Sequence, residues 1–308
     1  MRWDASRSPA RRREKGVPTP SWAGACVLAG LLGFLSGIPA GGVSAQWISP
    51  PGEGWVDLTL RHQDTRERFD LDGTRRDIFA EGRAVTWSAF LTGNVGLLQG
   101  TDLWVELPVH RLRFDDAGGE RESSGVGDPR IFLRAGPELL GLPPWPVALR
   151  GGVKLDVGDF DVDAEVIPLG EGQRDWELLL ELGRSLHPRS LWTMGWVGHR
   201  WREANPAAQR TPGDEWFWWW SLGGEAGPVA WRMSLEGLSG GVWTLEGGIR
   251  PPSTRRRFRQ AMVDAGVGLG PGTVRLGLEV PVSGRNLPAG AAVSVGYFVR
   301  WDRGMVGR

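Results

Sequence analysis

The chain of 308 residues has one cysteine, one tyrosine and, beyond its first 45 residues, no long apolar run. The cysteine therefore has no partner for a disulfide within the chain, and the body of the chain has no segment that could cross a membrane as a helix. Basic and acidic residues balance at 36 each, so no strong net charge favours nucleic acid or acidic substrates. Glycine (47) and tryptophan (18) are abundant instead, which suits many short strands joined by tight turns.

Metal-ligating residues are equally sparse. The four histidines, His62, His110, His187 and His199, are scattered along the chain, and no two of them have the spacing of metal ligands. We therefore predict no metal site and no cofactor.

The first 45 residues have the pattern of an export signal. A basic stretch precedes the apolar run Ala23–Ile38, and small residues before Gln46 form a cleavage site after Ala45. The apolar run is shorter than the roughly 20 residues that a spanning helix needs, although an uncleaved anchor helix is the alternative. We expect residues 1–45 to be removed and residues 46–308 to form the mature domain.

The stretch Thr101–Ala135 contains two runs in which apolar and polar side chains alternate, separated by a polar, glycine-rich loop. A period of two places an apolar ribbon on one face of a strand and polar groups on the other. Each run has about ten residues, the length that a tilted strand needs to cross a bilayer. The stretch therefore predicts a membrane-crossing hairpin whose lipid face includes Leu103, Val105, Leu107 and Val109.

The same unit recurs from Trp55 to Trp301, in about twelve strands. Long polar loops are expected at 64–79, 114–127, 158–174, 202–214 and 239–253, and they alternate with short turns near residues 93, 140, 187, 227 and 271. This asymmetry is typical of outer-membrane barrels. We predict an all-β fold, a transmembrane antiparallel up-and-down β-barrel, and the alternative is an exported pair of soluble β-sandwiches.

The faces opposite the apolar ribbons carry charges of both signs, which could pair across a lumen and stiffen or narrow it. The candidate lumen-lining residues are Asp57, Arg61, Glu106, His110, Arg130, Arg134, Arg150, Lys154, Asp156, Glu177, Glu181, Arg232, Glu236, Asp264, Arg275 and Glu279.

Tryptophans concentrate in the third quarter of the chain. They predict the girdle of aromatic rings found where barrels meet the membrane interface, although a stacking platform for sugars or aromatic substrates is the alternative. The candidate girdle residues are Trp192, Trp196, Trp216, Trp218, Trp220, Trp231 and Trp301. Phe217 and Trp219 alternate with three of them and could line the lumen.

Three further patterns are weaker. The acidic loop Asp159–Glu165 imitates the start of a calcium loop but lacks its glycine and closing glutamate, which favours a solvated loop. The basic run Arg255–Arg259 could bind lipopolysaccharide phosphates or simply be solvated. Gly237–Gly241 matches the G-x-S-x-G pattern around Ser239, but the residues that follow predict a strand or loop rather than the helix that a nucleophile elbow requires.

Three motifs resemble those of the outer-membrane transporter family named for the meta-pathway of phenol degradation, which is similar in style to fatty-acid and aromatic-hydrocarbon channels. They are Glu106-Leu107-Pro108, Gly125-Val126-Gly127-Asp128, and the loop Pro168–Asp175, and the resemblance covers residues 85–200. It implies a barrel with a role in uptake.

The expected function is a porin-like channel in the outer membrane of a Gram-negative bacterium, for passive uptake of a small apolar or aromatic molecule. Its expected partners are membrane lipid, lipopolysaccharide, the cargo and the barrel-assembly machinery, with no nucleic acid. The alternative is a structural or adhesive barrel without transport. An outer-membrane lipid hydrolase is a weaker alternative, and we expect no enzymatic activity.

Overall fold

The computed structural model describes residues 48–163 and 165–302. The predicted signal segment, residues 1–45, lies outside them. The long strands are β1 (Gly54–Thr65), β4 (Arg83–Leu98), β5 (Thr101–Asp116), β6 (Gly119–Val126), β7 (Arg130–Ala135), β8 (Val147–Lys154), β9 (Asp175–Ser185), β10 (Leu191–Arg202), β12 (Glu215–Ala226), β13 (Val229–Gly240), β15 (Arg257–Leu269), β16 (Gly272–Arg285) and β18 (Ala292–Trp301).

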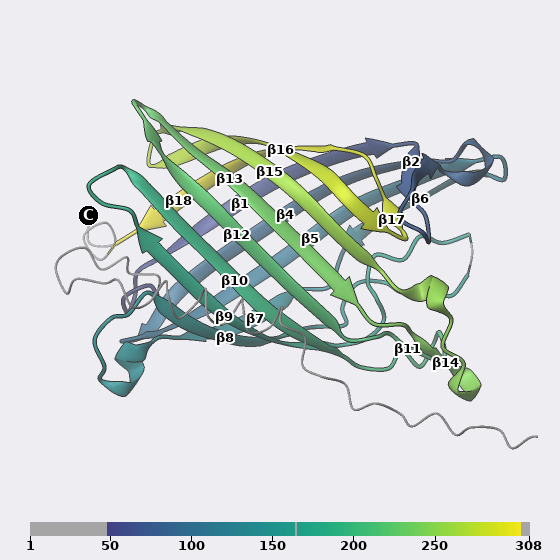
Figure 1. The fold of residues 1–308 in the computed structure, drawn as a ribbon, viewed down its shortest axis with the longest axis horizontal. Coiled ribbons are helices and arrows are strands. Elements are labelled where there is room, and N and C mark those ends of the chain that lie inside the picture. Colours follow the sequence, from purple (N-terminus) through teal and green to yellow (C-terminus); the bar gives the residue numbers. More distant parts are fainter. Residues whose placement is uncertain (1–47, 164, 303–308) are drawn as a thin grey trace, which may run out of the picture. The chain divides into compact units, whose positions relative to one another are not determined.

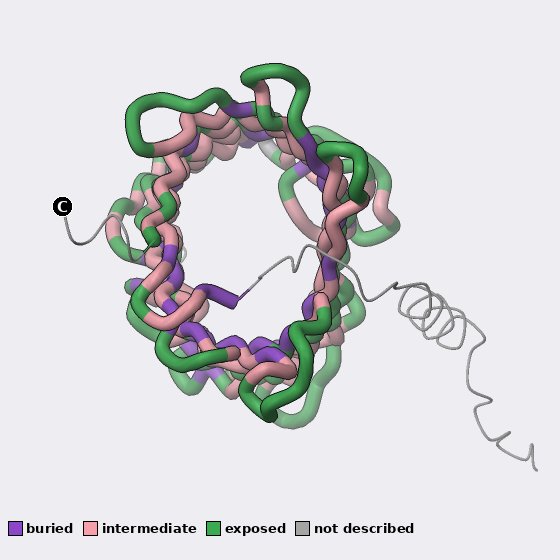
Figure 2. The backbone as a smooth tube through the Cα atoms, turned by 90° about the vertical axis from the view of Figure 1, so that its left-hand side faces the viewer, coloured by how far each residue is buried: buried purple, intermediate pink, exposed green. Residues whose placement is uncertain are grey.

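These strands form one closed antiparallel sheet. Except for β6 and β7, which do not pair with each other, each long strand pairs with those next to it in this series, and closure comes from β18, which pairs with β1 from Gly54↔Trp301 to Gln63↔Ala292. Because β6 and β7 pair with successive halves of β5, they occupy one position in the wall, and the result is a barrel of twelve strands as predicted. Figure 1 shows the tilted strands, and Figure 2 shows the backbone closed into a ring.

The wall is interrupted between β6 and β7. The segment Gly127-Asp128-Pro129 separates the two strands, and Pro129 has no backbone N–H to offer a ladder. The Gly127 N–H still donates to the Pro108 carbonyl at 2.9 Å. Among the described residues, β6 pairs only with β5, so its other edge is free of strand partners. Asp128 lies in this interruption, so its side chain does not follow the alternation of the strands, and its contacts are described with the functional site.

The two faces of the wall have opposite chemistry. On the outer face, Leu58 and Leu60 are 47% and 46% exposed, whereas Asp102 and Ser221 on the inner face are fully buried. A soluble sandwich would bury its apolar face, so this inversion excludes the sandwich alternative. The apolar core is small and lies inside the barrel, where Phe132, Leu179 and Phe217 pack together.

Two predicted connections were wrong. The turn expected near residue 93 does not exist, because β4 continues through Gly93 and Asn94, and the chain reverses at Gly100, whose φ is +74°. The loop expected at 114–127 is largely strand. Charged side chains pair across β5 and β6 there, including Arg113 with Glu120 at 2.8 Å, and this cross-strand pairing lets a polar sequence extend the hairpin beyond the barrel.

The loops on the long-loop side carry short elements. These are β2 (Glu67–Phe69), β3 (Arg75–Asp77), β11 (Arg210–Thr211), β14 (Thr244–Leu245), β17 (Leu287–Pro288) and the 3₁₀ turns η1 (Phe79–Glu81), η3 (Glu246–Gly248) and η4 (Pro252–Thr254). On the opposite side, η2 (Pro137–Leu140) lies in the β7–β8 connection. In the described part of the chain, no helix has the length and apolarity to span a membrane.

Candidate functional site

The candidate functional site is the lumen, whose wall begins at the short-turn end with Asp102. This carboxylate is fully buried and accepts two hydrogen bonds from Arg134, at 2.6 and 2.8 Å. It also accepts from the Asn94 amide at 2.8 Å and from the Ser49 backbone N–H at 3.0 Å. The segment that precedes β1 is thereby attached to the inner wall.

Further along the same wall, Glu181 bridges two arginines. Its carboxylate lies 2.8 Å from Arg150 and 3.3 Å from Arg134. The Arg150 guanidinium also lies over two aromatic rings, 4.9 Å from the centroid of Trp104 and 5.1 Å from that of Phe132. Cationic and aromatic side chains therefore share this part of the lumen, and the charge is balanced by both a carboxylate and ring faces.

At mid-wall, the carboxylates of Glu177 and Glu215 hold Arg200 at 3.0 and 2.8 Å. Glu177 also lies 3.5 Å from Arg130, which pairs with Glu106 at 2.6 Å. These five residues come from β5, β7, β9, β10 and β12, and the contact of Arg130 with Glu177 links β7 to β9 across the intervening β8.

Near the long-loop end, Lys154 is surrounded by acids. Its ammonium lies 3.0 Å from Asp128, 2.9 Å from Glu171 and 3.3 Å from Asp175, and only 2% of its side chain is exposed. A buried ammonium requires such compensation because desolvation of an unpaired charge is costly. The cluster joins β8, β9, the interruption before β7 and the loop 155–174.

Asp128 anchors that loop. Its carboxylate accepts hydrogen bonds from the backbone N–H groups of Gly158 at 3.0 Å, Val157 at 3.3 Å and Glu171 at 2.8 Å. Both ends of the loop 155–174 are thereby attached at the place where the wall is interrupted.

Glu171 attaches the loop to the opposite side of the cluster. Its carboxylate lies 2.7 Å from Arg202 and 3.3 Å from Arg256. Burial by itself would raise the pKa of Glu171, but the charges of Arg202, Arg256 and Lys154 outweigh it and hold the pKa well below its usual range. Glu171 is therefore ionised at neutral pH and below.

Three outer loops meet around Arg210. Its guanidinium lies over the ring of Trp243, 4.3 Å from the centroid, and 5.4 Å from the ring of Phe160. Asn205 donates from its side-chain amide to the Glu171 carbonyl at 2.8 Å. The loops 155–174, 203–214 and 241–256 thus form one connected group, which we call the outer-loop cluster.

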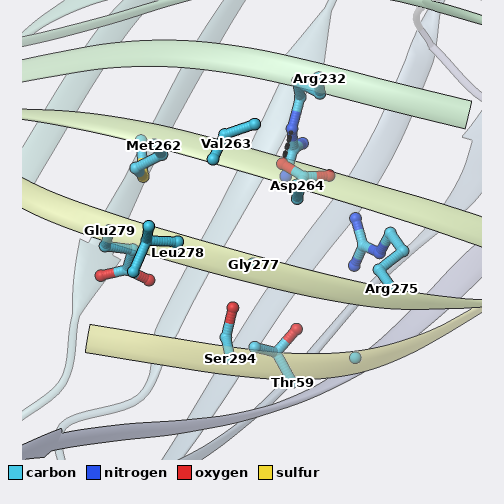
Figure 3. A pocket seen from close by; sticks show the side chains of 11 residues that line it. Thr59, Arg232, Met262, Val263, Asp264, Arg275, Gly277, Leu278, Glu279 and Ser294 are labelled. Carbon is cyan, nitrogen blue, oxygen red and sulfur yellow. Dashed lines mark hydrogen bonds and ion pairs between the residues drawn. The ribbon is translucent and has the colours of Figure 1, made fainter. Parts of the chain in front are cut away.

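The opposite wall, formed by β13, β15, β16, β18 and β1, is organised differently. Its ion pairs are separate from one another: Arg232 with Asp264 at 2.7 Å, Arg61 with Glu279 at 2.8 Å, and Arg275 with Asp57. A recess of about 120 Å³ lies on this wall. Figure 3 shows the Arg232–Asp264 pair on one side of it and Ser294 and Thr59 on the other.

A larger cavity of about 550 Å³ lies between the two walls. Trp196, Phe217 and Phe258 supply aromatic surface to it, Gln63 and Gln260 supply amides, and Glu236 supplies a carboxylate. Its size matches the range of small-molecule sites, but its lining is more charged than is typical of them, with four arginines and two glutamates.

The structure places the predicted lumen residues on the inner face with one exception. Asp156 follows the end of β8 and is exposed in the loop, because the strand ends at Lys154 and its alternation does not continue. His110 lies on the inner face, where its Nδ1 is 2.8 Å from the Ser88 hydroxyl.

Two of the predicted girdle residues are on the wrong face. Trp196 stacks on Trp219 inside the barrel, and its ring is edge-on to Phe217 at 5.7 Å between centroids. Trp192 has the same parity on β10, meaning that it is an even number of residues from Trp196 and points to the same side of the wall. It pairs with Gly223, and its ring lies over that glycine. Trp216, Trp218 and Trp220 do point outward, at 60%, 38% and 45% exposure.

The other two candidate girdle residues share the outer parity of their strands. Trp231 alternates with the inward Arg232, and Trp301 donates from its indole N–H to the Gly52 carbonyl at 3.2 Å. His199 lies between the rings of Trp201 and Trp216, with centroids 4.6 Å from each. Outward aromatic surface therefore continues beyond the predicted set.

Sequence reasoning missed several members of the buried network. Alternation places Asp175 on the inner face of β9 with Glu177, and Glu215 on the inner face of β12 with Phe217. These two residues could therefore have been predicted from the sequence. Arg200 and Arg202 have the parity of Trp196, and assigning that tryptophan outward concealed them. Alternation could not have found Glu171 or Asp128, because both lie outside the regular strands, although both stand in motifs that carry the family resemblance.

The weaker patterns resolve as follows. In the acidic loop, the carboxylates of Asp161 and Asp163 accept from the backbone N–H groups two residues later, each at 3.0 Å. Across the described residues, no group of three potential ligands could hold a metal ion. Ser239 lies within β13, so the strand excludes a nucleophile elbow.

The basic run is divided between the two faces. Arg256 turns inward and pairs with Glu215 and Glu171, whereas Arg257 and Arg259 are exposed on the outer side of β15. Only part of the run is therefore available to phosphate groups outside the barrel.

Comparison with known proteins supports the fold. No family model matches the chain, and no curated protein is similar to it in sequence. Among solved structures, the COG4313 outer membrane channel from Pseudomonas putida F1 is 14% identical, with a TM-score of 0.68, covering 85% of this chain and all of that one. This likeness shows that the chain has the fold of an outer-membrane β-barrel.

Two weaker likenesses have lower TM-scores. The β domain of the Bordetella autotransporter BrkA is 10% identical, with a TM-score of 0.49, covering 81% of this chain and all of that one. The monoaromatic hydrocarbon channel CymD is 9% identical, with a TM-score of 0.43, covering 87% of this chain and 96% of that one. The family noted from the three sequence motifs therefore remains a resemblance.

Proposed function

We propose that the protein is a channel in the outer membrane of a Gram-negative bacterium, which lets a small apolar or aromatic molecule cross passively. The cavity of about 550 Å³ carries this proposal, because aromatic rings from β10, β12 and β15 face a space within the lumen. The apolar outer face supplies the membrane contact, and the fold is that of a solved outer-membrane channel.

The proposed partners follow from this location. Membrane lipid contacts the outer face, and lipopolysaccharide phosphates contact exposed arginines such as Arg257 and Arg259 beside the long loops. The barrel-assembly machinery inserts the chain, and the cargo occupies the cavity. We propose no enzymatic role, since the G-x-S-x-G serine lies in a strand.

Planar bilayers test the proposal directly. The purified barrel should conduct ions, and benzyl alcohol at millimolar concentration should interrupt the current as it occupies the aromatic cavity. A change in gel mobility on boiling verifies that the barrel is folded. A folded barrel without conductance, or a current that benzyl alcohol leaves unchanged, overturns the proposal.

The alternative is a structural or adhesive barrel, and one observation favours it. The ion-pair network links strands from β5 to β12, reaches Arg256 just before β15 and, with the outer-loop cluster, lines one side of the lumen. A barrel that folds and inserts but never conducts supports this alternative.

A further inference from the structure

The cavity contains one carboxylate that has no partner. Other acids on the inner faces of the described strands have an ion-pair partner within 4.0 Å, but the structure gives Glu236 no hydrogen bond and no ion pair. Glu236 lies on the cavity wall. Since an uncompensated charge in a confined space is costly, this position favours a ligand that supplies the missing positive charge.

The surroundings of Glu236 increase that preference. In the strand register it lies directly between Trp219 on β12 and Gln260 on β15. Glu279 and Arg61 also act on it electrostatically, but Arg61 already pairs with Glu279 at 2.8 Å. Arg61 is therefore held by Glu279, and Glu236 is left to be neutralised either by a proton or by a cation that a ligand brings.

The arginines that line the cavity do not supply an equivalent anion site. Arg61, Arg130, Arg200 and Arg256 each hold at least one carboxylate, as described above. An anionic cargo would have to displace one of these carboxylates and would also be repelled by Glu236. A cationic cargo, in contrast, can bind the Glu236 carboxylate without displacing another side chain.

The aromatic rings near Glu236 suit the body of such a cation. Trp219 stacks on Trp196 with centroids 5.9 Å apart and planes inclined by 17°, and Trp196 meets Phe217 edge-on. The wall already uses ring faces for its own cations, since Arg232 lies over Trp219 at 5.8 Å and Arg200 over Phe217 at 5.1 Å. Indole faces are the best of the aromatic partners for cations.

We propose that the cavity is a binding site for an aromatic ammonium, with Glu236 accepting the ammonium group and the rings of Trp196, Phe217 and Phe258, which line the cavity, packing on the aromatic body. Gln260 lies opposite Glu236 and can accept a second N–H with its amide oxygen. The inference rests on the proposed function, to which it adds the charge class of the cargo.

Titration calorimetry on the folded, detergent-solubilised barrel tests the proposal with three probes that share a phenyl ring on a two-carbon chain and differ in the charge of the terminal group. The probes are 2-phenylethylammonium, neutral 2-phenylethanol and anionic 3-phenylpropionate. We expect the ammonium to bind best and the carboxylate worst. Glu236→Gln should weaken ammonium binding about tenfold or more, the effect of losing a charge-assisted hydrogen bond, and leave 2-phenylethanol binding unchanged.

Two further variants keep the test decisive. Glu120→Gln, on the exposed hairpin of β5 and β6, makes the same chemical change away from the cavity and should leave ammonium binding unaltered. Gln260→Glu adds a second carboxylate opposite Glu236 and should strengthen ammonium binding, which provides a test even if Glu236→Gln fails to fold. Each variant is verified by its gel mobility before and after boiling.

Equal affinity of the original chain for the ammonium and the alcohol overturns the proposal, and so does unchanged ammonium binding in Glu236→Gln. These failures differ from failure of the channel. A barrel that conducts and is interrupted by benzyl alcohol but does not prefer the ammonium keeps the proposed function and loses only this site. Glu236-dependent binding without conductance keeps the site and loses the channel.

Discussion

The two walls of the lumen contain the same residue types in different arrangements. On the wall from β5 to β12, charges share partners and are buried, as in the Lys154–Asp175 pair, with side-chain exposures of 2% and 0%. On the wall from β13 to β1, Arg232 and Asp264 pair alone and are 34% and 17% exposed. A carboxylate can accept several hydrogen bonds, so charges that lie close together on nearby strands of one wall form a network rather than separate pairs.

This difference assigns separate roles to the walls. The buried network fixes the position of the loop 155–174 and stiffens one side of the barrel. The isolated pairs leave room beside them, and the recess of about 120 Å³ lies on that wall. The larger cavity lies where the two arrangements meet, with Arg200 on one side and Glu236 on the other.

The largest effect should come from the buried network. Asp102→Asn removes the carboxylate that accepts two hydrogen bonds from the buried Arg134 guanidinium, at 2.6 and 2.8 Å. Removing one partner of a buried ion pair costs about 3 to 5 kcal/mol, so the free energy of unfolding should fall by that amount. Urea unfolding in lipid vesicles, followed by tryptophan fluorescence, measures it. A loss under about 1 kcal/mol would mean that this wall is no more cohesive than the other.

The next effect tests the outer face of the same wall. Val105→Arg places a charge on the lipid face of β5 and should cost about 2 to 4 kcal/mol near mid-membrane. Its matched control is Glu106→Gln at the adjacent, inward position, where a partly exposed ion pair with Arg130 is lost at a smaller cost. Equal stabilities in urea would mean that the two faces are assigned incorrectly.

A smaller effect should follow from releasing the loop 155–174. Glu171→Gln removes a carboxylate shared by Lys154, Arg202 and Arg256, each of which keeps another acid partner, so we expect a loss of about 1 to 3 kcal/mol. The loop should also move more freely, and current fluctuations in planar bilayers should increase. Unchanged fluctuations would show that Glu171 does not fix the loop.

The pH dependence of the same contact has a defined sign. Because the pKa of Glu171 is lowered in the folded state, its contribution is fully present above the usual glutamate pKa and is lost as the pH falls through the lowered value. The original chain should therefore show steady currents from neutral pH down to the usual glutamate range, with fluctuations rising only at lower pH. A transition near neutral pH would contradict the assignment.

The smallest effect is expected on the open wall. Asp57→Asn removes the partner of Arg275, which is 24% exposed and can be hydrated by lumen water. The cost should be about 1 kcal/mol or less, as for other exposed ion pairs. Urea unfolding beside Asp102→Asn provides the direct comparison, and equal costs would remove the distinction between the walls.

Much of the barrel could be predicted from the sequence. The period of two assigned the faces of nearly every strand, since neighbouring side chains on a strand must point to opposite sides. It failed where other forces decide. Gly93-Asn94 resembles a turn but is carried through β4 by its pairing with β1 and β5, and the charged stretch after Arg111 became strand through cross-strand ion pairs.

The tryptophans show the limit of composition as a guide. A cluster of indoles suggested an interface girdle, yet Trp196 and Trp192 lie inside, because β10 places them on the face of Arg200 and Arg202. Following the parity of β10 strictly would have placed all four residues inside. The aromatic surface of the cavity depends on this correction.

The sequence by itself determined a transmembrane barrel of about twelve strands, because alternation is a local property that each strand carries in its own residues. Only the tertiary structure decided which charges meet. Glu171 contacts Arg256 across a separation of 85 residues, and the closed barrel leaves Glu236 without a partner. Partners across a lumen are set by strand tilt and closure, which no short stretch of sequence contains.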